Sequence, residues 1–240
     1  MSRRRSSRVA QVLRLLGVMT FAAAAPAAAE TIALIGTGNV GAALGRRFAE
    51  QGHTVIYGSR TPQAADVVEL VRITGRGAVA LAPAAAAARG RVVVIAVPWT
   101  AAEDVVRGLG DLAGKIVVDP TNPRVMAADG FADYPPLPDS NAERIARLAP
   151  KAHVVKAFST LGAETMLDPR LAKSAVTIPI VGDDREAKQV VAGLARAIGF
   201  EAVDAGPLRH ARILEGLHYL RANAAGGRIN FHFPRDPARD

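Results

Sequence analysis

The sequence predicts an α/β fold, in which a doubly wound, mostly parallel sheet carries helices on both faces and is followed by a C-terminal helical segment. Apolar runs of strand length alternate with helical patterns from Glu30 onward. Several runs are apolar at every position, which is typical of strands buried on both faces. A glycine-rich turn joins the first run to the first helical pattern. The 240 residues, half of them hydrophobic, suit one globular domain of this class.

The predicted strands and helices follow one another along the chain. The strands at 31–35, 91–97 and 115–119 are the continuously apolar ones. The segment 122–140, rich in Pro and Asp, is the one long irregular stretch, and its place after a central strand makes it a candidate active-site loop. The predicted strands are 31–35, 54–57, 78–81, 91–97, 115–119, 153–157, 176–181 and 201–204. The predicted helices are 40–51, 63–73, 100–109, 142–148, 184–198 and 208–225.

The first 29 residues have the pattern of a secretory signal peptide. A positive region over Arg3–Arg8 precedes a short apolar run, and three alanines ending at Ala29 form a small-residue cleavage site. The apolar run is too short for an ordinary membrane span. The sequence therefore predicts export, with a periplasmic location, cleavage near Ala29 and no stable membrane span afterwards. The arginines of 2–5 fit a twin-arginine signal without its Phe-Leu-Lys continuation, so both that route and the Sec route stay open.

The domain organisation follows from this cleavage. Residues 30–240 are expected to form a dinucleotide-binding domain with a small substrate-site extension from about 150 to 240. About 35 residues follow the last predicted strand, too few for a separate all-helical domain.

Composition excludes several classes of function. The chain has no cysteine, so disulfides, thiolate metal sites and a cysteine nucleophile are excluded. Its five histidines are scattered, and we expect no metal site. The net charge of +8 includes five arginines before Ala29, without which 25 basic residues face 22 acidic ones. This near balance, with no basic patch interleaved with aromatics, argues against nucleic acid as a partner.

The turn after the first strand has the spacing of a phosphate-binding loop. Gly36, Gly38 and Gly41 form a G-x-G-x-x-G match between a strand and an amphipathic helix. In this context the first glycine permits the tight turn, the second lets the backbone approach a pyrophosphate, and the third lets the helix pack against the sheet. The positive end of the helix then binds the phosphates. The fold is therefore expected to be of the Rossmann type, with residues 36–41 (Gly36, Thr37, Gly38, Asn39, Val40 and Gly41) at the cofactor.

The end of the second strand indicates which dinucleotide binds. An acidic residue there usually binds the 2′-hydroxyl of NAD, but this chain has Ser59, Arg60 and Thr61. Arg60, 22 residues after Gly38, suits a 2′-phosphate through charge-assisted hydrogen bonds, and the two hydroxyls can add to them. The sequence therefore predicts NADP(H) as the cofactor.

Three turns at the carboxyl ends of later strands are expected to surround the nicotinamide. Val97, Pro98 and Trp99 follow the fourth strand, Asn122 follows the fifth, and residues 158–160 follow the sixth. Pro98 and Trp99 are candidates for one wall of the site. Asn122 is a candidate to hydrogen-bond the carboxamide or a second substrate.

No acid–base group stands out, and the catalytic residue is left unknown, with Lys156 and Asn122 as candidates. A reaction at a carbonyl needs a proton with the hydride. A reaction with a flavin-like ring mainly needs stacking. An alternative interpretation of Lys156 is a surface or paired lysine.

The last helix and the tail close the chain. Leu208, Ile213, Leu214, Leu217 and Leu220 predict an apolar helix face that covers the sheet. Gly226 and Gly227 are expected to end this helix. The aromatic tail 229–233 is a candidate to cap the substrate pocket or to contact a dimer partner.

Taken together, these motifs resemble the NADPH-dependent coenzyme F-420 (F420) reductases and the wider group of predicted dinucleotide-binding reductases. The resemblance covers residues 31 to about 233. Its carriers are the residues of 35–41, 58–60, 97–99, 154–158, 182–184 with 187–188, and 204–208 with 211–212.

The resemblance implies hydride exchange between NADPH and a deazaflavin stacked on its nicotinamide, in a homodimer. It implies that Pro98 and Trp99 flank the hydride site. It also implies that NADP is bound by Thr37, Asn39, Val40, Ser59 and Arg60. Because the group includes the reductase domain of membrane metalloreductases, the small-molecule acceptor stays open between a deazaflavin and a flavin.

Two other functions stay open from the sequence. One is a non-catalytic NADP-binding redox sensor or partner subunit. The other is a small carbonyl or imine reductase with Lys156 as the acid.

Overall fold

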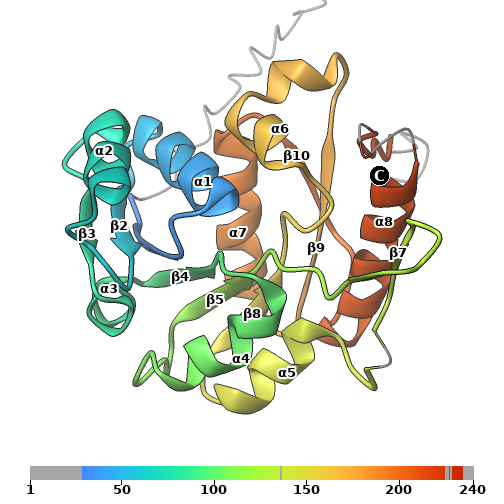
Figure 1. The fold of residues 1–240 in the computed structure, drawn as a ribbon, viewed down its shortest axis with the longest axis horizontal. Helices are drawn as coiled ribbons and strands as arrows, with labels where there is room; N and C mark the ends of the chain where they lie inside the picture. The colour runs from blue at the N-terminus through green and yellow to red at the C-terminus, as the bar shows by residue number, and fades with distance from the viewer. Residues whose placement is uncertain (1–28, 136, 225–226, 228, 235–240) are drawn as a thin grey trace, which may run out of the picture.

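A computed structural model describes residues 29–135, 137–224, 227 and 229–234. Residues 1–28 lie outside this range, and with them nearly all of the predicted signal peptide. The described chain forms one sheet in the order β10-β9-β8-β5-β4-β1-β2-β3 and a small hairpin, β6-β7. Helices cover the large sheet on both faces, as predicted (Figure 1).

The elements agree closely with the predicted ones and add several that the sequence did not reveal. The strands are β1 Thr31–Ile35, β2 Thr54–Gly58, β3 Val79–Leu81, β4 Val92–Ile95, β5 Ile116–Asp119, β6 Val125–Met126, β7 Ala132–Asp133, β8 His153–Lys156, β9 Thr177–Gly182 and β10 Glu201–Asp204. The helices are α1 Asn39–Glu50, α2 Ala65–Thr74, α3 Pro83–Arg89, α4 Trp99–Arg107, α5 Asn141–Leu148, α6 Ala163–Leu167, α7 Arg185–Ala197 and α8 Ala211–Asn223, with 3₁₀ turns η1 Pro169–Ala172 and η2 Leu208–His210.

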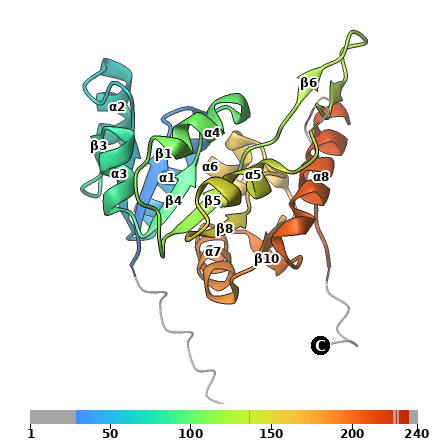
Figure 2. The ribbon, with the colours of Figure 1, turned by 90° about the horizontal axis from the view of Figure 1, so that it is seen from below.

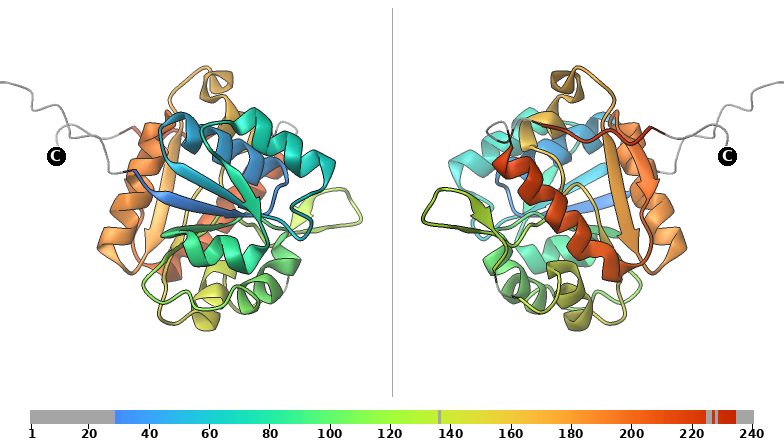
Figure 3. Two further views of the ribbon diagram at one scale, coloured as in Figure 1. Left: turned by 90° about the vertical axis from the view of Figure 1, so that its left-hand side faces the viewer. Right: turned by 90° about the vertical axis from the view of Figure 1, so that its right-hand side faces the viewer.

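The central strands are buried on both faces, which confirms the prediction from their apolar runs. In β1, Ile32 and Leu34 belong to one core cluster, and Ala33 and Ile35 belong to the other. Helices α1, α2, α6 and α7 lie on the first face, and α3, α4 and α5 lie on the second (Figures 1 and 3). Because successive side chains of a strand point to opposite faces, only an uninterrupted apolar run can serve both layers.

Two strands at one edge of the sheet run against the others. The strands from β3 to β8 along the sheet pair in parallel, but β9 pairs antiparallel with β8 through Val155–Gly182 and Lys156–Val181. β10 then pairs in parallel with β9. The sheet is therefore mostly parallel, as expected, with a reversed pair of strands at one edge.

The sequence analysis missed four elements because their signals are short or weak. Helix α3 lies in an alanine-rich run that shows no amphipathic period, and α6 spans five residues. The segment 122–140 is not wholly irregular, since it contains the β6-β7 hairpin, which projects from the body (Figure 2). Two-residue strands leave too few positions for an alternation to be visible.

Only part of the predicted apolar face of helix α8 packs against the body. Leu208 and Leu214 are buried, as predicted, but Ile213 and Leu220 are 63% and 56% exposed. Ala211 and Glu215 are buried as well. The physical reason is an ion pair of Glu215 with the buried Lys156, which holds this polar residue of the helix inward. The predicted end at Gly226 lies outside the described residues, and α8 ends at Asn223.

The aromatic tail lies beside the start of β9. The Thr177 N–H donates to the Phe231 carbonyl at 2.9 Å, and the Phe233 N–H donates to Thr177 Oγ1 at 3.1 Å. Within the described residues, no helix is long and apolar enough to cross a membrane.

Candidate functional site

The carboxyl ends of β1, β2 and β4 meet at one point of the sheet edge. The Gly36 N–H donates to the Gly58 carbonyl at 2.9 Å, and the Ala96 N–H donates to the Ile35 carbonyl at 2.8 Å. β1 lies between β2 and β4, so the chain crosses to opposite sides of β1 here. Such a switch point is where doubly wound sheets bind ligands.

Two of the three glycines in the turn have a steric reason, and the third does not. Gly36 has φ +114°, and a Cβ there would lie 2.2 Å from the Ala96 carbonyl oxygen. A Cβ on Gly41 would lie 2.1 Å from the Gly36 carbonyl oxygen. A Cβ on Gly38, in contrast, would meet nothing within 4 Å among the described residues. Two glycines are therefore required by packing, whereas Gly38 faces open space.

The first turn of α1 suits a phosphate group. Gly38 is its N-cap, no side chain caps it, and no acidic residue lies in its first turn. The first N–H groups of a helix have no partner within the helix, and the helix dipole adds positive potential there. Thr37 and Val40 are half-buried and Asn39 is exposed. The residues present therefore fit a dinucleotide pyrophosphate.

The three residues after β2 differ in exposure. Ser59 is buried, and its N–H donates to the Leu81 carbonyl while its Oγ accepts from the Thr61 N–H at 3.2 Å. Arg60 and Thr61 are exposed. Arg60 thus lies in an exposed turn that leaves β2 two residues after Gly58, the strand end that contacts the glycine turn, and no carboxylate is present among residues 58–61.

The turn after β4 opens helix α4 and contacts the segment after β5. Pro98 is the N-cap of α4 and Trp99 is its first residue. Trp99 Nε1 donates to the Arg124 carbonyl at 3.1 Å. Val97 is half-buried beside Gly36. The structure therefore brings the predicted 97–99 turn next to both the glycine turn and the segment 122–140.

The turns after β5 and β8 carry polar atoms that the protein leaves unpaired. Asn122 Nδ2 donates to the Ser159 carbonyl at 2.7 Å. Within the described part of the chain, Asn122 Oδ1, Ser159 Oγ and Thr160 Oγ1 are buried without a hydrogen-bond partner. Buried polar atoms are normally satisfied, so a cluster of unsatisfied ones marks a place where a ligand or water binds.

His218 of α8 adds to this cluster. Both of its ring nitrogens are buried, and neither has a hydrogen-bond partner among the described residues. Burial lowers the pKa of His218 to about 4, and the charges of Arg124, Arg221 and Lys156 add to this effect. The imidazole is therefore neutral at pH 7.

Lys156 lies in a fully buried ionic cluster below this polar surface. Its Nζ contacts Asp119 Oδ2 and Glu215 Oε1 at 2.9 Å each and donates to the Thr121 carbonyl at 2.7 Å. Lys156, Asp119 and Glu215 are all 0% exposed. Burial alone would lower the pKa of Lys156, but the two carboxylates outweigh it and raise this pKa. The structure thus agrees with the alternative interpretation of Lys156 as a paired lysine.

The cluster continues into the segment 122–140 and α5. The Tyr134 hydroxyl donates to Glu215 Oε2 at 2.7 Å, and the Asn141 N–H donates to Glu215 Oε1 at 3.0 Å. The Tyr134 ring packs edge-on against Tyr219, with ring centroids 5.5 Å apart, and the Arg212 guanidinium lies 4.7 Å from its centroid.

Sequence reasoning missed His218, Glu215 and Tyr134. The available signal was the polar pair Glu215 and His218, which lie three residues apart on α8. This signal predicts no site unless the side of α8 that carries the pair is known to face the body.

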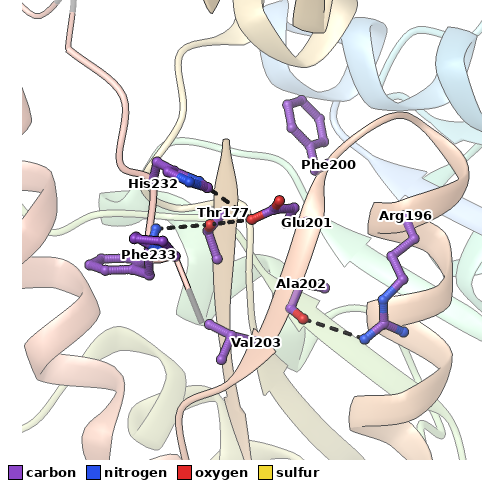
Figure 4. A pocket seen from close by; sticks show the side chains of 9 residues that line it. Thr177, Arg196, Phe200, Glu201, Ala202, Val203, His232 and Phe233 are labelled. Atoms are coloured by element: carbon purple, nitrogen blue, oxygen red, sulfur yellow. Dashed lines mark hydrogen bonds and ion pairs between the residues drawn. The ribbon is translucent and has the colours of Figure 1, made fainter. Parts of the chain in front are cut away.

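Other parts of the described chain offer less. Close to the tail, a cavity of about 520 Å³ lies between β9, β10 and α7 (Figure 4). Its polar groups are already paired with each other, since Thr177 Oγ1 donates to Glu201 Oε2 at 3.0 Å and His232 lies 3.4 Å from the same carboxylate. No group of three His, Asp or Glu side chains suited to a metal ion occurs among the described residues.

Comparisons with known proteins show which proteins this chain is similar to. The family model for NADP oxidoreductases that are coenzyme F420-dependent matches residues 31–123. The F420-dependent NADP reductase of Methanothermobacter thermautotrophicus is 34% identical over 204 residues, which cover 80% of this chain and 88% of that protein. A solved structure from Arthrobacter sp. FB24, described as a candidate F420-dependent NADP-reductase, is 31% identical with a TM-score of 0.78. The match covers 86% of this chain and 100% of that one.

A second group of relatives is much longer than this chain. The metalloreductase STEAP3 of Rattus norvegicus is 32% identical over 195 residues, which cover 80% of this chain. The chain spans 37% of that protein's length.

Proposed function

The chain belongs to the family of coenzyme F420-dependent NADP oxidoreductases, and from this premise we propose that it exchanges a hydride between NADPH and a planar acceptor of the deazaflavin or flavin type. It is an NADP-dependent oxidoreductase, as the family model and the F420-dependent NADP reductase that it matches are. NADPH, when bound, supplies the hydride from its nicotinamide ring.

We propose that the glycine turn and the end of β2 bind the cofactor. The uncapped first turn of α1, from Gly38 to Gly41, would donate backbone N–H groups to the pyrophosphate. Arg60, with Ser59 and Thr61, would bind the 2′-phosphate, because a guanidinium pairs with phosphate in a planar, two-point geometry. Val97, Pro98 and Trp99 would flank the nicotinamide end.

The choice of acceptor rests on one observation. The polar surface of the site offers unpaired hydrogen-bonding atoms but, among the described residues that form it, no cationic acid that could protonate a substrate. Asn122, Ser159, Thr160 and His218 offer unpaired hydrogen-bonding atoms among the described residues, as a ring with carbonyl and imino groups requires. Reduction of a carbonyl would need an acid to protonate the developing alkoxide. Lys156 is sealed from solvent and bound on all sides, and His218 is neutral at pH 7. We therefore assign Lys156 no direct catalytic role.

Stopped-flow spectroscopy with a panel of acceptors tests this function. We expect NADPH to be oxidised when F420 or a flavin is the acceptor, and this oxidation is measured as the loss of nicotinamide absorbance. We expect no NADPH oxidation with simple ketones or imines. Turnover confined to ketones or imines would contradict the proposal and favour a small carbonyl or imine reductase. Tight NADP binding with no oxidation by any acceptor would favour a redox sensor or partner subunit.

Two further expectations from the sequence stand as proposals. We propose that the protein is exported after cleavage near Ala29, and that it forms a homodimer. Mass spectrometry of protein recovered natively from its compartment would show the cleavage site and any bound cofactor. Light scattering of the same material would give the oligomeric state.

A further inference from the structure

Glu215 is the point where three separate parts of the chain meet. Its carboxylate accepts from the Tyr134 hydroxyl of the segment 122–140, accepts from the Asn141 N–H at the start of α5, and contacts the Lys156 ammonium at the end of β8. The side chain itself comes from α8 and is 0% exposed. A single buried carboxylate therefore joins four elements around the acceptor side of the site.

We propose that Glu215 is a positioning residue, whose carboxylate fixes α8 and the segment 122–140 against the end of β8 and so sets the shape of the acceptor site. This inference deepens the proposed function and rests on it for the identity of the site. Glu215 acts through its neighbours and is not proposed to touch substrate.

The hydrogen-bond donors around the cluster show which charge state the geometry favours. Both oxygens of Glu215 accept from donors, and Asp119 accepts from Lys156 and from the N–H and hydroxyl of Thr121. An oxygen surrounded by donors favours the ionised carboxylate. Two buried carboxylates thus share one ammonium, and this arrangement is sensitive to the loss of any member.

Tyr134 can keep its hydrogen bonds when Glu215 is protonated. The Tyr134 hydroxyl also donates to the Asp139 carbonyl oxygen at 3.3 Å. When Glu215 is protonated at Oε2, the tyrosine oxygen can accept a hydrogen bond from that proton and donate to Asp139 instead. Protonation would therefore weaken the contact of Glu215 with Lys156 without leaving Tyr134 unpaired.

The carboxylate controls residues that face the site. His218 and Tyr219 follow Glu215 by three and four residues and so lie one helical turn further along α8. Tyr219 packs on Tyr134, and its hydroxyl donates to the Pro123 carbonyl. The residue next to Pro123 is Arg124, whose carbonyl accepts from Trp99. A shift of Glu215 is thus transmitted to His218, to the segment 122–140 and to Trp99.

The charged groups around Glu215 define its pH dependence. They are Lys156 on β8, Asp119 on β5 and Tyr134 in the segment 122–140, with Arg212 on α8 placed over the tyrosine ring. Burial raises the pKa of Glu215 against the attraction of Lys156, and the charge of Asp119 adds to the rise. The folded protein therefore binds a proton here at a higher pH than the unfolded chain does.

The test compares Glu215→Gln with the wild-type protein. Trp99 is the only tryptophan of the chain, and its hydrogen bond to the segment 122–140 makes its fluorescence a reporter of that segment without any acceptor. In the wild type we expect the fluorescence and the acceptor KM to change together as the pH is lowered and Glu215 takes up a proton. In Glu215→Gln neither should show this pH-dependent change. The acceptor kcat/KM should be about 10- to 100-fold lower at pH 8, with the NADPH Kd unchanged.

Two more variants separate positioning from general stability. Tyr134→Phe keeps the ring and removes the hydroxyl, so it should shift the fluorescence in the same direction by a smaller amount. Asp204→Asn removes an exposed carboxylate, paired with Lys188 at 2.8 Å, and should leave the fluorescence profile unchanged.

The outcomes for the two proposals are distinguishable. A fluorescence profile that is the same in Glu215→Gln and in the wild type would overturn the positioning role. So would an equal loss of NADPH affinity and acceptor kcat/KM. Absence of any acceptor turnover in the wild type would overturn the proposed function, whereas the fluorescence comparison would still decide the role of Glu215.

Discussion

The two halves of the candidate site are built in different ways. The proposed cofactor side consists of short segments that are local in sequence, namely the glycines and N–H groups of the turn after β1 and the first turn of α1, with the exposed residues that follow β2. The acceptor side consists of buried side chains from β5, β8, α8 and the segment 122–140, and Tyr134 and Glu215 are 81 residues apart. The first half depends on local sterics, and the second depends on charges that the whole fold brings together.

This difference predicts different failures. A change in the glycine turn alters shape and leaves few charges unpaired. A change in the acceptor-side cluster leaves a buried charge without its partner, which costs more than the same change at the surface. The variants below are ordered from the largest expected effect to the smallest.

Lys156→Met is expected to be the most destabilising change, because it removes the ammonium that contacts both Asp119 and Glu215 in the buried cluster. The free energy of unfolding should fall by about 3–5 kcal/mol at pH 7, measured by urea denaturation. The loss should become smaller as the pH is lowered, because burial already raises the pKa of Glu215 and the variant lacks the ammonium that opposes this rise. As a control, Lys188→Met breaks a pair with the exposed Asp204 and should cost less than about 1 kcal/mol. Equal losses in the two variants would show that the buried cluster contributes no more to the free energy of unfolding than an exposed ion pair does.

Gly36→Ala and Gly38→Ala separate packing from binding on the cofactor side. Gly36→Ala places a methyl group 2.2 Å from a carbonyl oxygen at φ +114°, and should lower the free energy of unfolding by about 2–4 kcal/mol. Gly38→Ala meets open space and should change it by less than about 0.5 kcal/mol. The methyl group at position 38 would nevertheless occupy the face proposed for the pyrophosphate, so NADP affinity should fall at least about tenfold by calorimetry. Full NADP affinity in Gly38→Ala would contradict the proposed cofactor site.

Arg60→Glu tests the choice of dinucleotide with the smallest effect on the fold. Arg60 is exposed, so thermal unfolding should be unchanged. The NADP affinity should fall by about 1.5–3 kcal/mol, because a carboxylate would replace the guanidinium beside the 2′-phosphate, whereas NAD affinity should stay or rise. Lys151→Glu is a matched control, since Lys151 is also exposed and lies at the amino end of the strands. Equal NADP affinity in the two variants would exclude a role for Arg60.

Most of the fold was predictable because its signals are local. The apolar runs of β1, β4 and β5 predict strands that are buried on both faces, and the glycine spacing predicts the turn before α1. The hairpin β6-β7 was not predictable, because strands of two residues show no alternation of polar and apolar positions. The reversed direction of β9 was not predictable, because it depends on the strand with which β9 pairs in the folded sheet. The leucines of α8 predicted its packing only in part, since Leu214 is buried but Ile213 and Leu220 are exposed, and the ion pair of Glu215 turns a polar residue inward.

The sequence by itself determined the strand–turn–helix order around β1, the glycine turn and the lack of an acidic residue directly after β2, because each depends on residues that are neighbours along the chain. Only the tertiary structure decided that Lys156 is a buried partner of Asp119 and Glu215, and that Tyr134 contacts Glu215. The physical reason is the distance along the chain over which each kind of interaction acts. Steric and periodic constraints act within a few residues, whereas the pairing of buried charges depends on which distant segments the packed core brings into contact.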